Sequence, residues 1–204
     1  TVTMVCNGEI YNYAELIEEH KLDVSSHSDC EVIIPLYEKY GFKKTIEMLD
    51  GVFACILHDS KEDRVFVARD PIGVRALYIG ATDGSYAICS ELKGIHTICK
   101  DVISFPPGFI WNNKTNKYAQ YTNVMSRTLP LTQSQVDNAQ TTHKFHTNVD
   151  IIKLNIKSKL INAVKKRLIS DRPIGCLLSG GLDSSLIASI LSKLIQTNKA
   201  NQKK

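Results

Sequence analysis

The 204-residue sequence lacks any apolar run of 18 residues, which is about the length that a membrane-spanning helix requires. Its N-terminus also lacks the basic and then apolar pattern of a secretory signal. Six cysteines are scattered along the chain without a single C-x-x-C pair, an arrangement that argues against a zinc site or a disulfide framework. We therefore expect reduced thiols, no membrane segment and a cytoplasmic location.

A Walker-type phosphate loop is also missing, because no glycine is followed by Lys-Ser or Lys-Thr. Instead, an apolar run at residues 174–178 leads into a small-residue turn at 179–185 and then into a helical pattern. Consecutive glycines let the backbone approach a ligand, and serine hydroxyls add donors beside the free N–H groups of a helix start. We predict a phosphate-binding strand, turn and helix. An ordinary glycine-rich turn is the alternative.

Acidic residues are scarce in the last part of the chain. Residues 149–204 carry a net charge of +8, whereas the first 148 residues carry −4. Most of those lysines lie on the polar face of an amphipathic helix predicted at residues 149–168, so we interpret them as a solvated face and expect no nucleic-acid partner. Residues 122–148 are polar and without apolar periodicity, which predicts a linker between domains at 1–121 and 149–204.

The first domain is dominated by the two-residue alternation that is typical of β-strands. We predict strands at residues 2–6, 52–58, 65–68, 77–80, 86–89, 109–111 and 118–121, a turn at 7–12, and helices at 13–19, 28–41 and about 91–98. Ser28 or Asp29 is the expected N-cap of the second helix, and Pro35 should kink or tighten its first turns. Antiparallel strands with a few helices predict a layered α+β domain.

Four motifs in this domain resemble, in order, the glutaminase domain of class II glutamine amidotransferases. They are NGEIYN at residues 7–12, DCEVI at 29–33, LDGVFA at 49–54 and RDPIGVR at 69–75. Together with RPIG at 172–175 and the loop at 179–185, they resemble the glutamine-hydrolysing asparagine synthetase family. The resemblance implies an Ntn-type αββα glutaminase domain, followed by the first βα unit of an α/β ATP-pyrophosphatase domain of the adenine nucleotide alpha hydrolase-like kind.

The same resemblance implies an activity, namely ATP-dependent conversion of aspartate to asparagine through a β-aspartyl-adenylate. The ammonia comes from glutamine, whose amide is attacked by an N-terminal cysteine. Glutamine, aspartate and ATP are then the substrates, Mg²⁺ accompanies ATP, and a homodimer is left open. Thr1 does not fit as the nucleophile, because it lies on the same strand as Asn7, whereas the nucleophile strand of the family comes much earlier in the chain. Cys6 does not fit either, because it lies within a strand and has no free amine. We expect this chain to be a piece of a longer enzyme and inactive by itself.

The family match also assigns site residues. Asn7 and Gly8 correspond to the oxyanion hole, and with Glu9 and Asp29 they bind glutamine, the two carboxylates holding its α-ammonium group. A solvated turn residue is the alternative for Glu9, and a plain N-cap is the alternative for Asp29. Residues that correspond to the ATP and pyrophosphate site are Leu178, Ser179, Gly180, Gly181, Asp183 and Ser184. Asp183 is also the expected ligand that holds Mg²⁺ through pyrophosphate.

Two rival interpretations remain open. Another class II amidotransferase with the same two domains, such as a β-lactam-forming synthetase or another aminating ligase, would carry the same motifs. A non-catalytic remnant that binds glutamine or a nucleotide would also carry them.

Overall fold

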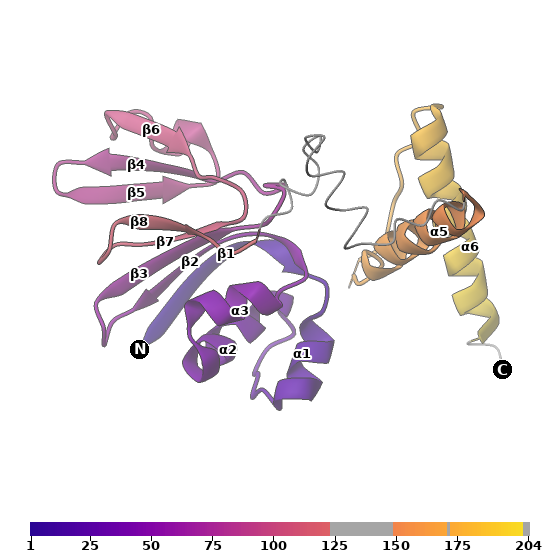
Figure 1. Cartoon of the computed structure of the whole chain (residues 1–204), viewed down its shortest axis with the longest axis horizontal. Helices are drawn as coiled ribbons and strands as arrows, with labels where there is room; N and C mark the ends of the chain where they lie inside the picture. Colours follow the sequence, from indigo (N-terminus) through magenta and orange to yellow (C-terminus); the bar gives the residue numbers. More distant parts are fainter. Residues whose placement is uncertain (123–148, 171, 202–204) are drawn as a thin grey trace, which may run out of the picture. The chain divides into compact units, whose positions relative to one another are not determined.

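The computed structural model describes residues 1–122, 149–170 and 172–201, so the predicted linker lies outside the described residues except for Thr122. The chain divides into two compact units, Thr1–Leu129 and Pro130–Lys204. Figure 1 shows the course of the chain through each unit. Within the described ranges, no helix is both long enough and apolar enough to cross a membrane.

The first unit contains two antiparallel sheets. The larger sheet has the strand order β1 (Val2–Ile10), β2 (Gly51–Asp59), β3 (Arg64–Arg69), β7 (Phe109–Asn112) and β8 (Lys117–Gln120). The smaller sheet has the order β5 (Ser85–Cys89), β4 (Tyr78–Thr82) and β6 (Asp101–Ser104). The strand β6 was not predicted, whereas the predicted helix at 91–98 is only a short 3-10 turn, η2 (Leu92–Gly94), followed by turns.

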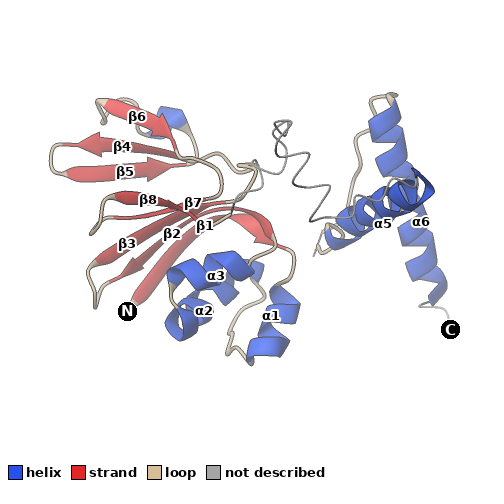
Figure 2. Ribbon diagram, in the orientation of Figure 1, coloured by secondary structure: helices blue, strands red, loops and turns tan. Residues whose placement is uncertain are grey.

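Helices cover one face of the larger sheet, and the smaller sheet covers the other (Figure 2). These helices are α1 (Tyr13–His20), the 3-10 turn η1 (Asp29–Val32), α2 (Ile33–Tyr40) and α3 (Phe42–Met48). Pro35 is the third residue of α2, where a backbone N–H has no acceptor within the helix, and the preceding turn is tightened as predicted. The short helix α3 was not predicted. It begins directly after Gly41, whose φ of 77° ends α2.

The apolar core has two parts, because side chains of a strand alternate between its faces. On β2, Phe53, Cys55 and Leu57 pack toward the helices, whereas Ala54 and Ile56 pack toward the smaller sheet. Phe105 and Trp111 complete the core between the sheets. These layers agree with three of the four layers of the predicted αββα arrangement. No α-helix covers the outer face of the smaller sheet among residues 1–122, so the fourth layer is not seen there.

The strand β1 corrects the turn that we predicted at residues 7–12. It continues through Ile10 and pairs with β2 along its whole length, with Asn7 opposite Ala54. Asn-Gly is a common turn signal, but here the glycine serves close strand pairing. A Cβ atom on Gly8 would collide with the Val52 carbonyl oxygen and lie 2.7 Å from the Cα atom of Phe53. Residues 7–9 are therefore held in an extended, paired backbone.

The second unit contains the helices α5 (Val149–Lys166), close to its predicted bounds, and α6 (Leu182–Asn201), which follows the small-residue turn as predicted. The predicted strand at residues 174–178 is wrong, since this segment has no regular secondary structure. A parallel strand needs a neighbour for its backbone hydrogen bonds, and the described residues of this unit contain no strand. Leu177 is consequently 95% exposed. The predicted apolar stripe of α5 is buried only at Val164, while Ile156 is 60% exposed.

Candidate functional site

The backbone of Gly8 faces the open edge of the larger sheet. In an antiparallel pair, the N–H and C=O groups of successive residues point alternately toward and away from the partner strand. Tyr11 donates its N–H to Asp50 and thus points toward β2, whereas Ile10 donates its N–H away from β2 to Asp29. Gly8 has the same orientation as Ile10, two residues further along the strand. Its N–H group is therefore presented at the edge where β1 has no strand neighbour among the described residues.

The carboxylate of Asp29 binds to this edge at Ile10, the last residue of β1. Its Oδ2 atom accepts the backbone N–H of Ile10 at 2.6 Å. Ser28 takes the N-cap position, as one of the two predicted candidates, but it makes no side-chain capping hydrogen bond. Asp29 is not the N-cap, because its carboxylate bonds across to β1 instead. The Cys30 thiol contacts the Gly8 carbonyl oxygen at 3.9 Å, which also ties η1 to this strand. The structure thus places Asp29 beside the predicted residues of β1.

The side chains of Asn7 and Glu9 lie on the face of β1 opposite to the buried Ile10 side chain, and both are exposed. The Asn7 side chain donates from Nδ2 to Ser90 Oγ at 3.0 Å. The Glu9 carboxylate lies 3.6 Å from a guanidinium nitrogen of Arg75. Sequence reasoning did not assign Ser90 or Arg75 to the site. Arg75 lies in one of the matched motifs, whereas Ser90 had only been interpreted as a helix start.

Two buried charged residues build the loop that carries Arg75. The Asp70 side chain, 1% exposed, accepts four backbone N–H groups, those of Ile72, Gly73, Val74 and Arg75, at 2.6–3.1 Å. The Arg69 guanidinium donates to the carbonyl oxygens of Gly73, Arg75 and Phe105 and to Ser104 Oγ. Since Asp70 accepts the N–H of Arg75 and Arg69 donates to its carbonyl oxygen, the backbone of Arg75 is fixed at both its polar groups.

The Asp70 contacts predict a large effect on stability. Asp70→Ala should lower the free energy of unfolding of the first unit by about 3 kcal/mol, because four partly buried N–H groups lose the buried carboxylate that accepts their hydrogen bonds. Urea unfolding followed by tryptophan fluorescence measures this change. Asp83→Ala is the matched control, since the Asp83 carboxylate is almost fully exposed beside Lys100 and should change stability by less than about 0.5 kcal/mol. Equal stability of the two variants would contradict the proposed role of Asp70.

Glu31 orders the loop that precedes Asp29. Its carboxylate accepts hydrogen bonds from the backbone and hydroxyl groups of Ser25 and Ser26. These donors, led by the Ser25 N–H, lower the pKa of Glu31 from its usual 4.5 to about 2. The loop and the position of Asp29 are thereby linked to the charge of Glu31.

This pKa predicts the acid response of the loop. A lowered pKa in the folded state means that the stabilisation is complete above about pH 4.5 and is lost as the pH falls toward 2. Protection of the Ser25 and Ser26 amides, measured by NMR as the exchange rate relative to the intrinsic rate at each pH, should rise with pH across this window. Glu31→Gln should remove this rise, with Glu15→Gln on α1 as the control. A similar loss of pH dependence in the control would contradict the assignment to Glu31.

In the second unit, the predicted phosphate loop connects residues 174–178 to α6. Gly180 has a φ of 84°, in the left-handed region that favours glycine. The Ser184 hydroxyl donates to the Gly181 carbonyl oxygen at 3.1 Å and lies 2.9 Å from the Ser179 hydroxyl. Leu178, Ser179, Gly180, Gly181 and Asp183 are exposed, and Ser184 is half-buried, at the start of a 20-residue helix. The loop can therefore receive an anion at the α6 N-terminus.

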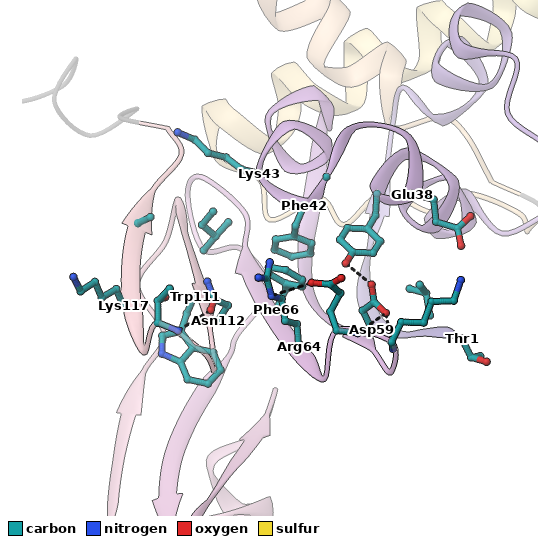
Figure 3. Close-up of a pocket in the computed structure, with 18 residues that line it drawn as sticks. Thr1, Glu38, Phe42, Lys43, Asp59, Arg64, Phe66, Trp111, Asn112 and Lys117 are labelled. Carbon is teal, nitrogen blue, oxygen red and sulfur yellow. Dashed lines mark hydrogen bonds and ion pairs between the residues drawn. The ribbon is translucent and has the colours of Figure 1, made fainter.

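A separate cavity of about 930 Å³ lies at the opposite end of β1 and β2 (Figure 3). It is lined by side chains of α2, α3 and β3 and of the ends of β2 and β7, including Phe42 of α3, Phe66, Asp59 and Asn112. The hydroxyl of Tyr37 donates to Asp59 at 2.8 Å, and burial, together with this carboxylate, raises the pKa of Tyr37 to about 12. None of the predicted site residues lines this cavity, so it is distinct from the candidate site on β1.

Comparison with known proteins matches both units. The family model of the glutamine amidotransferase domain covers residues 1–97, and that of asparagine synthase covers residues 155–200. Asparagine synthetase [glutamine-hydrolyzing] 1 of Arabidopsis thaliana is 41% identical over 98% of this chain, and its namesake in Saccharomyces cerevisiae is 41% identical over 97%. Nearly the whole chain is thus homologous to glutamine-hydrolysing asparagine synthetases. This confirms the predicted relationship, and the chain spans 32% of the length of each of these two relatives.

Solved structures support the fold of the first unit. The glutamine phosphoribosylpyrophosphate amidotransferase from B. subtilis, complexed with ADP and GMP, is similar with a TM-score of 0.53 and 25% identity. The similarity covers 59% of this chain and 29% of that protein. The predicted class II glutaminase fold is thereby confirmed for this asparagine synthetase homologue. The roles of individual site residues stay predictions.

Proposed function

We propose that this chain provides the glutamine-binding wall and the phosphate loop of an enzyme that makes asparagine from aspartate, ATP and glutamine. The observation that carries the proposal is the Gly8 N–H at the open edge of β1. Asn7 and Glu9 flank Gly8 on the same strand, and Asp29 bonds to that strand at Ile10. An amide side chain and a backbone N–H are the donors that an oxyanion needs during acyl transfer. Two carboxylates close to them suit an α-ammonium group.

The second unit supports the ATP-dependent half of the reaction. Ser179, Gly180, Gly181 and Ser184 would hold the phosphates, and ATP would activate the aspartate carboxylate for attack by ammonia. The described residues contain no group of three His, Cys, Asp or Glu side chains that could hold a metal ion. This fits a Mg²⁺ ion that takes most ligands from phosphate and water, with Asp183 as the single carboxylate.

The six cysteines support a cytoplasmic setting. All of them are free thiols, and Cys30, Cys55 and Cys99 are buried. Burial is the main cause that raises the pKa of Cys55 to about 12, so this thiol behaves as an apolar core group rather than as a nucleophile. A homodimer remains a prediction from the family resemblance alone.

A chimeric synthetase tests the proposed function directly. In this protein, residues 1–204 replace the matched segment of the Arabidopsis thaliana asparagine synthetase 1. We expect asparagine formation from aspartate and ATP with either glutamine or ammonia as nitrogen donor. Asparagine formation with ammonia but not with glutamine would contradict the glutaminase assignment. Loss of both in a folded, ATP-binding chimera would contradict the whole proposal and favour a non-catalytic binding role.

A further inference from the structure

The amide of Asn7 has a partner from a distant part of the chain. Asn7 lies on the exposed face of β1, where a side chain of this type is free to adopt several rotamers. Its Nδ2 atom nevertheless donates to Ser90 Oγ at 3.0 Å, across 83 positions of sequence. An Asn side chain carries two Nδ2 protons. One of them is therefore committed to Ser90, and the other remains available to a ligand.

Ser90 is itself held in place by the smaller sheet. It directly follows β5, whose last residue, Cys89, pairs with Tyr78 of β4. The Glu91 N–H then bonds to the Cys89 sulfur at 3.4 Å, so the backbone on both sides of Ser90 is anchored. The larger sheet carries Asn7, and the smaller sheet supplies its acceptor. The two sheets share an apolar core, which keeps this pair in register.

We propose that Ser90 is a positioning residue of the glutaminase site, which orients the Asn7 amide toward the developing oxyanion. The inference rests on the proposed function, because it takes Asn7 as the oxyanion donor. By accepting one Nδ2 proton, Ser90 selects a single orientation of the amide plane. The second proton then occupies a fixed position before glutamine binds, and no ordering of the side chain is needed when charge develops.

The position of Arg75 is consistent with such an arrangement. Its guanidinium lies 3.6 Å from Glu9 Oε1, two residues beyond Asn7 on the same face of β1. The partner of Asn7 directly follows β5 of the smaller sheet, and the partner of Glu9 lies shortly before β4 of the same sheet. The face is built by the contact between sheets rather than by β1 alone.

The test uses the 204-residue chain with Ser90→Ala and Ser90→Thr, and with Ser85→Ala at the other end of β5 as the matched control. Two quantities are measured by NMR: solvent exchange of the Asn7 side-chain amide protons, and affinity for L-glutamate, whose γ-carboxylate supplies an anionic oxygen. We expect Ser90→Ala to speed exchange and to weaken glutamate binding roughly fivefold to tenfold, the effect of one lost hydrogen bond. Ser90→Thr keeps the hydroxyl and should behave like the parent chain, as should Ser85→Ala.

The outcomes separate this inference from the proposed function. If Ser90→Ala leaves both the Asn7 amide exchange and glutamate affinity unchanged, the positioning role is overturned while the glutamine site stands. Weakened affinity in both Ser90→Ala and Ser90→Thr, with unchanged Asn7 exchange, also overturns it, because the effect is then one of packing. If the parent chain does not bind L-glutamate or L-glutamine at all, the glutamine site itself fails, and the positioning role fails with it.

Discussion

Asp183→Ala in the chimeric synthetase is expected to abolish asparagine formation with either nitrogen donor and to leave glutamine hydrolysis nearly intact. Asp183 is the second residue of α6, and its carboxylate is exposed at the helix start. The loop itself is held by Ser179, Ser184 and Gly181, so the substitution removes a charge without removing these hydrogen bonds. What is lost is the one carboxylate proposed for Mg²⁺ and pyrophosphate.

The matched control is Asp150→Ala, which removes a carboxylate from the first turn of α5 in the same unit. Its asparagine formation should equal that of the parent chimera. Pyrophosphate release and ammonia release are measured in parallel, so that the two half-reactions are followed separately. Continued asparagine formation by the Asp183→Ala variant would refute the assignment of Asp183 to the nucleotide site.

Asn7→Ala in the same chimera is expected to lower the turnover of glutamine hydrolysis by about 10²–10³-fold, the usual effect of removing one oxyanion donor. Asparagine formation from ammonia should persist, because the α6 loop does not depend on the amide. Thr3→Ala is the matched control, since Thr3 is exposed and points to the same face of β1 as Asn7. Glutamine-dependent and ammonia-dependent synthesis are compared at saturating ATP and aspartate.

A parallel fall of both activities in the Asn7→Ala variant would show a structural role instead. The pairing of β1 with β2 argues against this outcome. The backbone of Asn7 is paired opposite Ala54, and the strand is held at both ends by bonds from Tyr11 to Asp50 and from Ser60 to Thr1. The side chain contributes one exposed hydrogen bond to Ser90, so its loss should leave the strand in place.

The two predictions concern residues in separate units. In a double variant, glutamine hydrolysis should therefore fall as in Asn7→Ala alone, and asparagine formation should be lost as in Asp183→Ala alone. Each half of the reaction has its own donors: backbone and amide N–H groups on β1, and hydroxyl and N–H groups at the α6 N-terminus. Both sites use the same physical device, a preorganised set of donors aimed at negative charge. Their dependence on the fold differs. The β1 site needs contacts between two sheets, whereas the α6 loop is formed by residues adjacent in sequence.

Much of this protein was determined by the sequence through local patterns. Alternation of apolar residues located β2, β3, β5 and the β7–β8 hairpin, and helical periodicity located α1, α5 and α6. Motif order identified the family and pointed to Asn7, Gly8, Glu9, Asp29 and the α6 loop. These signals are local because side-chain periodicity and glycine turns depend on residues close in the chain.

Only the tertiary structure decided how the β1 site is assembled. Asn-Gly at residues 7 and 8 has the local signature of a turn, and pairing with β2 overrides it, because the missing Cβ allows the Phe53 backbone to approach. Asp29 has the signature of an N-cap, yet its carboxylate bonds to Ile10, 19 residues away. The converse holds at residues 174–178, where a strand-like sequence forms no strand without a neighbouring strand to pair with. Ser90 reaches Asn7 only because two sheets pack together, and no local pattern encodes a contact across 83 residues.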